Sequence, residues 1–303
     1  MYNTAMISVV IPTRNRPELL SNLLEYISEI LTKKDRIIVV DSSDYNLRIE
    51  KFPNRIPITF IYTAVKSAAI QRNIGIEQLS NEEFVFFLDD DVFPKTNYFD
   101  LLTSNLKIDD VVGVSGVAIS SKQKEKRKKP QGMSGFVHRL FLLDSKKDGR
   151  LLKSGINIPV RTKESKLLET QWLIGCSAWK VNKLSDTRFE KDFKGQSLAE
   201  DVIFSVRMRE KGKLLVNPSV ELLHYESEIE RPKPEEFWRM WVINRWRLIK
   251  VMKSGPLGVV AYWWANLGQF LILSFEMVRR KKLNWYSMKG LLLGVWDLIR
   301  KVK

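Results

Sequence analysis

Three consecutive aspartates, Asp89, Asp90 and Asp91, carry the clearest chemical signal in this chain. They follow the apolar run Phe84–Leu88, which is typical of a buried strand. Residues i and i+2 of an extended segment point the same way, so Asp89 and Asp91 can face one ligand together. Paired carboxylates repel a phosphate unless Mg²⁺ or Mn²⁺ lies between them. The spacing predicts a metal and diphosphate site; the alternative is acids that cap a helix or pair with lysines.

A second acidic pair, Glu200 and Asp201, opens a predicted helix that ends near Gly212. Acids are common in a first helical turn because of the helix dipole, so this pair alone is a weak signal. A carboxylate there can also act as a general base toward an acceptor hydroxyl. His224 follows the apolar stretch Val220–Leu223. Beside a metal held by the aspartates, its imidazole would suit a further coordination position; otherwise it is a structural histidine.

The elements that must position these residues alternate between strands and helices. We predict strands at Ile7–Ile11, Arg36–Val40, Ile58–Tyr62 and Phe84–Leu88. We also predict one helix that begins at Pro17 and a second helix over Ser67–Leu79. Continuous apolar strands between amphipathic helices indicate an α/β fold with a mainly parallel sheet covered on both faces. Ligands of such sheets bind beyond the carboxyl ends of the strands. The chain contains neither a G-x-G-x-x-G nor a P-loop motif, which argues against those nucleotide folds.

Composition narrows the class of protein further. The 303 residues carry 50 Lys+Arg and 35 Asp+Glu, a net charge of +15 that indicates an anionic partner. The single cysteine excludes a disulfide framework, and the two histidines exclude a His-rich metal cluster. The first residues lack the pattern of a secretory signal, so we expect the chemistry on the cytosolic side.

The last fifth of the chain combines positive charge with seven of the nine tryptophans. Ser254–Phe275 contains no charged residue, and basic residues flank it. We predict a membrane-embedded or interfacial helix there; a single span and a buried helix are the alternatives. Leu283–Arg300 is predicted to be an amphipathic helix in the headgroup plane, with a helix docked on the core as the alternative. A further basic run, at 122–129, is interpreted as a solvated loop, with membrane or phosphate contact as the alternative.

Together, several motifs resemble the GT-A glycosyltransferases of family 2, and rhamnosyltransferase-type members in particular. The matching segments are Val9–Leu20, Val39–Asp44, Ala68–Ile76, Phe87–Asp91, Trp172–Lys180, Ala199–Asp201 and His224–Ser227. The resemblance implies a GT-A Rossmann-like sandwich with a mainly parallel central sheet. It implies a catalytic domain over residues 1–228 and a helical membrane-association region over residues 229–303.

The resemblance also implies roles for individual residues. The catalytic residues would be Asp201, as base, and Glu200 beside it. The nucleotide-sugar would be bound by Pro12, Thr13, Arg14, Asp41, Arg72, Asn73, Asp89 and Asp90. Mn²⁺ or Mg²⁺ would be held by Asp89, Asp91 and His224. The pocket for the acceptor or the donor sugar would be lined by Trp172, Gly175, Cys176, Ser177 and Arg245.

The expected function is therefore inverting transfer of a sugar from a nucleotide-diphosphate donor, with dTDP-rhamnose or a UDP-sugar as candidates. The expected acceptor is a lipid-linked glycan in cell-surface polysaccharide synthesis, reached at an anionic membrane surface on the cytoplasmic side. No nucleic-acid partner is expected. The alternatives are a polyprenyl-phosphate sugar synthase, a non-catalytic nucleotide-sugar-binding relative, and a basic protein that binds membranes or nucleic acid without catalysis.

Overall fold

The computed structural model describes seven stretches of the chain and divides it into two compact units. The described residues are 5–45, 55–120, 130–161, 165–192, 198–225, 232–280 and 285–301. The first unit comprises Met1–Arg127 and Thr162–Ile229, and the second comprises Lys128–Arg161 and Glu230–Lys303. Residues 128–161, which lie inside the predicted catalytic domain 1–228, thus group with the C-terminal helices. The basic run at 122–129 lies outside the described residues.

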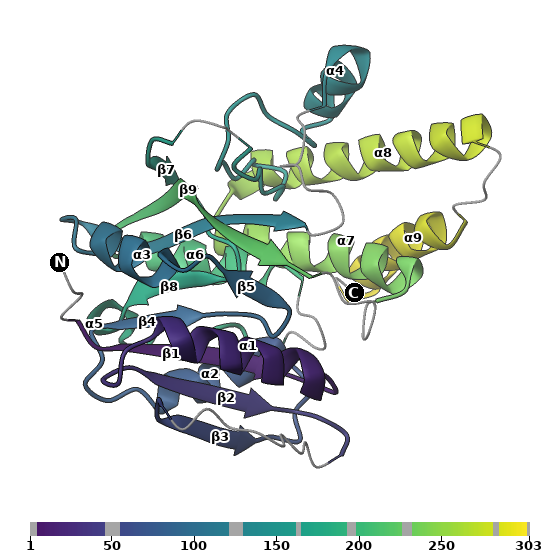
Figure 1. Cartoon of the computed structure of the whole chain (residues 1–303). Coiled ribbons are helices and arrows are strands. Elements are labelled where there is room, and N and C mark those ends of the chain that lie inside the picture. Colours follow the sequence, from purple (N-terminus) through teal and green to yellow (C-terminus); the bar gives the residue numbers. More distant parts are fainter. Residues whose placement is uncertain are drawn as a thin grey trace. The chain divides into compact units, whose positions relative to one another are not determined.

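The first unit is built on a sheet whose strand order is β3-β2-β1-β4-β8-β6-β9-β5, with β7 paired to β9 (Figure 1). The strands are β1 (Ile7–Thr13), β2 (Arg36–Asp41), β3 (Ile58–Tyr62), β4 (Phe84–Phe87), β5 (Val92–Pro94), β6 (Val111–Ser120), β7 (Leu168–Thr170), β8 (Ser177–Lys180) and β9 (Lys213–His224). Within the described residues, β5, β7 and β8 run against the other six strands. The central sheet is therefore mainly parallel, as the apolar runs predicted.

Helices cover both faces of this sheet because neighbouring strand residues point to opposite sides. The helices of this unit are α1 (Pro17–Ile30), α2 (Ala68–Glu77), α3 (Tyr98–Leu106), α5 (Val181–Leu184) and α6 (Glu200–Arg209). On β4, the ring of Phe86 packs 5.1 Å from that of Phe99 on α3. The next residue, Phe87, packs 6.3 Å from Phe204 on α6. Each face of the sheet thus has its own apolar core.

The second unit is helical. It consists of α4 (Gly132–Leu140), α7 (Pro234–Val251), α8 (Gly255–Arg280) and α9 (Trp285–Lys301) (Figure 1). Its core is formed by Val242, Ile249, Tyr262, Leu273, Met288, Leu291 and Leu298. In the segment before α7, Arg161 pairs with the buried Asp144 at 2.9 Å. With α7, α8 and α9, the structure confirms the predicted helices in the C-terminal part of the chain.

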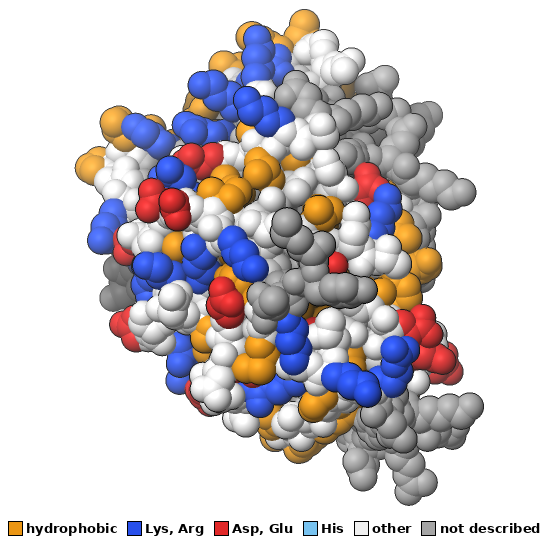
Figure 2. Space-filling model, turned by 60° about the vertical axis from the view of Figure 1, so that its left-hand side comes forward, with side chains coloured by type: hydrophobic (Ala, Val, Ile, Leu, Met, Phe, Trp, Pro, Cys, Tyr) orange, Lys and Arg blue, Asp and Glu red, His pale blue; other side chains and the backbone are white. Residues whose placement is uncertain are grey.

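Two surface properties bear on partners. Lys and Arg side chains are spread over the face drawn in Figure 2, with Asp and Glu side chains between them. Among the described residues, one helical stretch, Gly255–Val278, is long and apolar enough to cross a membrane by length and composition. Of the most apolar 18-residue stretch of this helix, only 39% is buried. One such helix is weak evidence for a membrane span.

Candidate active site

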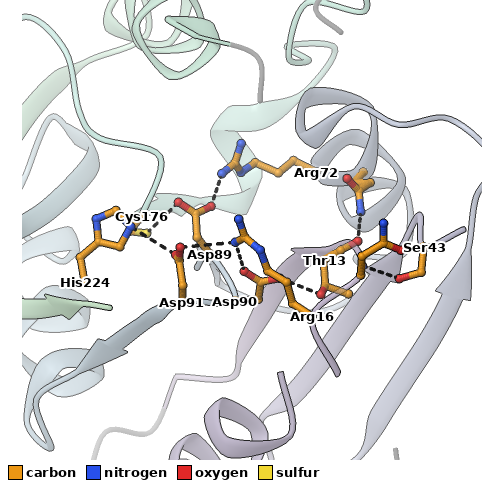
Figure 3. A network of polar contacts seen from close by, with 11 residues as sticks. Thr13, Arg16, Ser43, Arg72, Asp89, Asp90, Asp91, Cys176 and His224 are labelled. Carbon is orange, nitrogen blue, oxygen red and sulfur yellow. Dashed lines mark hydrogen bonds and ion pairs between the residues drawn. The ribbon is translucent and has the colours of Figure 1, made fainter. Parts of the chain in front are cut away.

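The three aspartates lie at the carboxyl end of β4, as predicted, and the sheet register brings His224 to them. β5 follows directly and pairs antiparallel with β9, with Val92 opposite His224. The backbone N–H of Tyr225 also donates to the carbonyl oxygen of Asp91 at 2.8 Å. As a result, His224 Nε2 lies 3.3 Å from Asp91 Oδ1 (Figure 3). The pairing of β5 with β9 thus brings together Asp91 and His224, which are more than 130 positions apart in the sequence.

This pair fits a divalent cation by its chemistry. Carboxylate and imidazole are ligands that Mn²⁺ accepts, and the carboxylate also suits Mg²⁺. Burial acts to raise the pKa of the Asp91 carboxyl, but its contacts with His224 and Arg16 outweigh burial and lower that pKa. The described residues contain no group of three His, Cys, Asp or Glu side chains placed to hold a metal. Asp91 and His224 are two side chains that could hold a cation here.

Asp90 connects the end of β1 to the residue before α1 through its hydrogen bonds, whereas Asp91 contacts His224. Its Oδ2 accepts from the Thr13 hydroxyl at 2.8 Å, and its Oδ1 accepts from Arg16 Nη1 at 2.8 Å (Figure 3). Burial raises the pKa of Asp90 to about 6, against the attraction of Arg16. Both carboxylate oxygens are thus bound by this chain, and Asp90 orients its neighbours.

Arg16 was missed from the sequence. Its Nη1 also lies 3.3 Å from Asp91 Oδ2, so one guanidinium contacts two of the three aspartates. A signal was present, because Arg16 directly precedes Pro17 and so sits between a strand end and the helix that follows. That position places a cation at the same sheet edge as the acids.

Arg72 joins three elements at the centre of the site. Its Nη2 donates to Asp89 Oδ1 at 2.6 Å, and its Nη1 donates to Glu200 Oε1. Arg72 lies on α2, Asp89 follows β4, and Glu200 opens α6. The side chains of Arg72 and Glu200 are buried, whereas that of Asp89 is 40% exposed. The start of α6, which carries Glu200 and Asp201, is therefore connected to the aspartate loop through a single arginine, Arg72.

Asp201 lies in the first turn of α6, beside Glu200. Burial is the main cause that raises the pKa of its carboxyl to about 6, and Arg72 partly opposes it. The backbone N–H of Val202 donates to Asp201 Oδ1 at 2.8 Å. A carboxylate whose pKa is raised above its ordinary value is a stronger base and is better suited to take a proton from a hydroxyl group.

Two amides beside Arg72 hold the backbone. Asn73 Nδ2 donates to the carbonyl of Phe189 at 2.9 Å, and the Phe189 N–H donates to Asn73 Oδ1 at 2.8 Å. Gln71, another residue missed from the sequence, donates to the carbonyls of Thr13 and Val40 at 2.8 and 2.6 Å. Gln71 therefore ties the ends of β1 and β2 together, and Asn73 fixes the loop ahead of α6.

The predicted nucleoside edge lies at the carboxyl ends of β1 and β2. Asp41 Oδ1 accepts from the N–H and hydroxyl of Ser43, at 2.8 and 2.6 Å. Pro12 is opposite Val40 in the strand register and is buried. Arg14 is more exposed and pairs with Asp44 at 3.0 Å.

The loop between β7 and β8 brings two of the predicted pocket residues, Gly175 and Cys176, close to Asp89. A Cβ on Gly175 would lie 3.1 Å from Arg72 Nη2, so glycine leaves room for that guanidinium. The buried thiol of Cys176 lies 3.6 Å from Asp89 Oδ2, and burial raises its pKa well above the usual range. Ser177 accepts from the indole N–H of Trp179 at 2.9 Å, and Trp172 is also buried.

Arg245, the remaining predicted pocket residue, lies on α7 in the second unit. Its guanidinium is buried, 3.8 Å from the ring centre of Trp241. It donates to the Ser154 carbonyl at 2.8 Å and to Asn266 Oδ1 at 3.4 Å. Burial lowers its pKa to about 9. These contacts bind Arg245 within the helical unit.

The sequence also matches a family model described as glycosyl transferase family 2, over residues 8–173. That range covers more than half of the chain and contains the aspartate loop, Arg16 and Arg72. The chain belongs to glycosyl transferase family 2. A comparison with curated proteins finds no match.

Solved glycosyltransferases share the fold of this family 2 protein. A mannosyltransferase from Pyrobaculum calidifontis, in complex with GDP-Man and Mn²⁺, matches with a TM-score of 0.59 at 14% identity, over 98% of this chain and 88% of its own. S. aureus TarS 1–349 with UDP-GlcNAc matches with a TM-score of 0.58 at 17% identity, over 98% and 82%. GalNAc-T7 with UDP, GalNAc and Mn²⁺ matches with a TM-score of 0.56 at 13% identity, over 80% and 48%. The predicted GT-A fold is thereby confirmed.

Proposed function

We propose that this family 2 glycosyltransferase is a metal-dependent, inverting enzyme whose general base is Asp201. The observation that carries the proposal is the arrangement around Arg72. This arginine pairs with Asp89 of the aspartate loop and with Glu200, the neighbour of Asp201. A base with a raised pKa is thus held next to carboxylates that suit a metal–diphosphate complex.

The mechanism follows from these positions. Asp201 takes the proton of the acceptor hydroxyl, and the hydroxyl oxygen attacks the anomeric carbon of the donor sugar. The bond between that carbon and the diphosphate oxygen breaks, and its electron pair leaves with the nucleoside diphosphate. A single in-line displacement inverts the configuration at the anomeric carbon. Glu200, paired with Arg72, fixes the start of α6 and with it the direction of Asp201.

Asp91 and His224 are the side chains proposed to hold Mn²⁺ or Mg²⁺, with Asp89 facing the same ligand. The bound cation would supply Lewis-acid stabilisation of charge on the diphosphate. Mn²⁺ is present in the structures of the mannosyltransferase and of GalNAc-T7, which supports a divalent cation here. Arg16 orients Asp91 by contacting its Oδ2, so that Oδ1 faces His224.

The donor is proposed to be a nucleotide-diphospho-sugar bound by Thr13, Asp41 and the aspartate loop. Structural relatives with bound UDP-GlcNAc and GDP-Man support this class of donor. The acceptor is proposed to be a lipid-linked glycan at the cytoplasmic side of an anionic membrane. The basic, tryptophan-rich helical unit supports that location.

The test is nucleotide release by the purified protein with Mn²⁺ or Mg²⁺, across UDP-, GDP- and dTDP-sugars. Asp91→Ala and Asp201→Asn should each abolish turnover. Asp186→Asn is the matched control, since the Asp186 side chain is 97% exposed, and it should retain full turnover. Turnover that survives in Asp201→Asn would remove the proposed base. Adding a polyprenyl phosphate or a lipid-linked glycan then separates a sugar-phosphate synthase from a glycan-extending transferase.

A further inference from the structure

In the second unit, α8 and α9 each bury one face in the core and leave a second set of large apolar side chains exposed. On α9, Gly290, Gly294 and Ser287 are buried. A Cβ on Gly294 would lie 2.8 Å from the Cβ of Val242 on α7, so the small residues allow close helix packing. Met288, Leu291 and Leu298 are buried beside these small residues. A helix docked on a protein core normally has a polar face opposite its buried apolar face.

The outward face of α9 consists of large apolar residues. Trp285, Leu292, Trp296 and Ile299 are each about half exposed. Lys289 and Arg300 lie among them, and Arg300 is 4.7 Å from the ring centre of Trp296. Tryptophans beside cations are typical of a helix that lies at a membrane–water interface.

α8 also exposes a stripe of large apolar side chains, and this stripe is longer than that of α9. Apolar residues that are at least 40% exposed recur every three or four positions, at Leu257, Val260, Trp264, Leu267, Leu271, Phe275 and Val278. At about 1.5 Å per residue, this stripe is about 30 Å long. Such a contiguous apolar face differs from the scattered apolar residues of an ordinary surface.

The inner face of α8 is fixed to the protein by polar contacts. Asn266 is buried and accepts from the Arg245 guanidinium, while the Tyr262 hydroxyl donates to the Val242 carbonyl at 2.9 Å. If α8 crossed a bilayer, it would either leave these partners unpaired or carry the buried Arg245 with it. Both are costly, because a desolvated cation without partners is strongly disfavoured. One face of α8 is therefore available to lipid and the other is not.

α4 extends this apolar surface. Met133, Phe136 and Leu140 are 76%, 57% and 50% exposed and recur at helical spacing. The end of α4 is joined to the exposed stripe of α8, because Trp264 Nε1 donates to the Leu140 carbonyl at 2.8 Å. The next ring, Phe141, packs 5.0 Å from Trp264.

We infer that α4, α8 and α9 form one docking face for an anionic phospholipid bilayer, with α8 lying in the plane of the membrane and not crossing it. The inference rests on the proposed action at a membrane surface and specifies the residues and orientation. A lipid occupant is favoured by the tryptophans, by the Lys and Arg residues at the helix ends and by the length of the apolar stripe. An anionic leaflet attracts such cations.

The test is flotation of the full-length protein with vesicles of phosphatidylcholine, with and without phosphatidylglycerol. The variants are Leu267→Glu with Leu271→Glu on α8, and Met133→Glu with Phe136→Glu on α4. Each pair should weaken binding to anionic vesicles about tenfold or more, because each puts two charges into an apolar face. Ile108→Glu is the control, since Ile108 is 42% exposed and belongs to the first unit, and it should bind like the parent protein.

Orientation is tested with a dye on single cysteines placed by Val260→Cys, Leu271→Cys or Val278→Cys; Cys176 is buried and remains in place. External dithionite, which does not cross vesicles, should reduce the dye at all three positions. Protection at one end would show a crossing helix and overturn the in-plane inference. Unchanged flotation of both glutamate pairs, or apolar-face variants that only convert a dimer to a monomer, would overturn the docking face. Nucleotide release without vesicles is measured in parallel, so loss of binding with intact turnover leaves the proposed catalysis standing.

Discussion

Replacing Arg72 with methionine should destabilise the first unit, and the structure gives the size of the effect. The change removes the partner of Glu200, whose side chain is only 6% exposed. An uncompensated buried charge costs about 3–5 kcal/mol. Asp89 adds little, because its side chain is 40% exposed and water screens it. We expect a loss of about 3 kcal/mol and a fall in Tm of about 6–12 °C.

The cause is tested by a second substitution. Glu200→Gln keeps the shape of the side chain and removes its charge, so the double variant Arg72→Met with Glu200→Gln should recover at least about half of the lost stability. The double variant should remain a poor catalyst, because Asp89 still lacks its 2.6 Å partner. Arg14→Met is the control: its partner Asp44 is exposed to water, which screens the pair, so the loss of stability should be much smaller than for Arg72→Met.

The assays are thermal and urea unfolding, with nucleotide release measured on the same samples. The explanation would be refuted by an Arg72→Met protein as stable as the parent. It would also be refuted if Glu200→Gln restored no stability in the Arg72→Met background. Either result would mean that the charge of Glu200 is satisfied without this arginine.

Further outcomes are expected at the other site residues. Asp201 must be ionised to act as a base, so kcat/KM should fall as pH drops through about 6, the pKa to which burial raises it, and Asp201→Asn should be inactive throughout; a flat profile from pH 5 to 8 would exclude this role. His224→Ala should raise the Mn²⁺ concentration needed for half-maximal turnover and weaken Mn²⁺ binding in calorimetry, since Nε2 lies 3.3 Å from Asp91; an unchanged metal titration would leave His224 a structural role. Gly175→Ala should lower turnover about tenfold with little loss of stability, because the new methyl group would lie 3.1 Å from Arg72 Nη2; full activity would show that the guanidinium can move aside.

The local pattern of the sequence determined the framework of the catalytic unit. Apolar runs with β-branched residues ended where β1, β2, β3 and β4 end, to within two residues. A proline at the first helical position marked the start of α1. Because the carboxyl ends of parallel strands share one edge, the sequence also placed Asp41 and Asp89–Asp91 on that edge.

Contacts between site residues that are far apart in the sequence became known only from the tertiary structure. The contacts of Arg72 with Asp89 and Glu200 depend on how α2 and α6 pack on the sheet. Asn73 shows the same dependence: its amide clamps Phe189, a contact that no local pattern indicates.

The orientation of the C-terminal helices was also a tertiary outcome. Helical spacing identified two faces on residues 283–300, but spacing cannot say which face packs inward. The structure buries Gly290 and Gly294 and leaves Trp285 and Trp296 exposed. Sequence periodicity thus fixes which residues share a face, whereas the surface available on the neighbouring helix determines which face is covered.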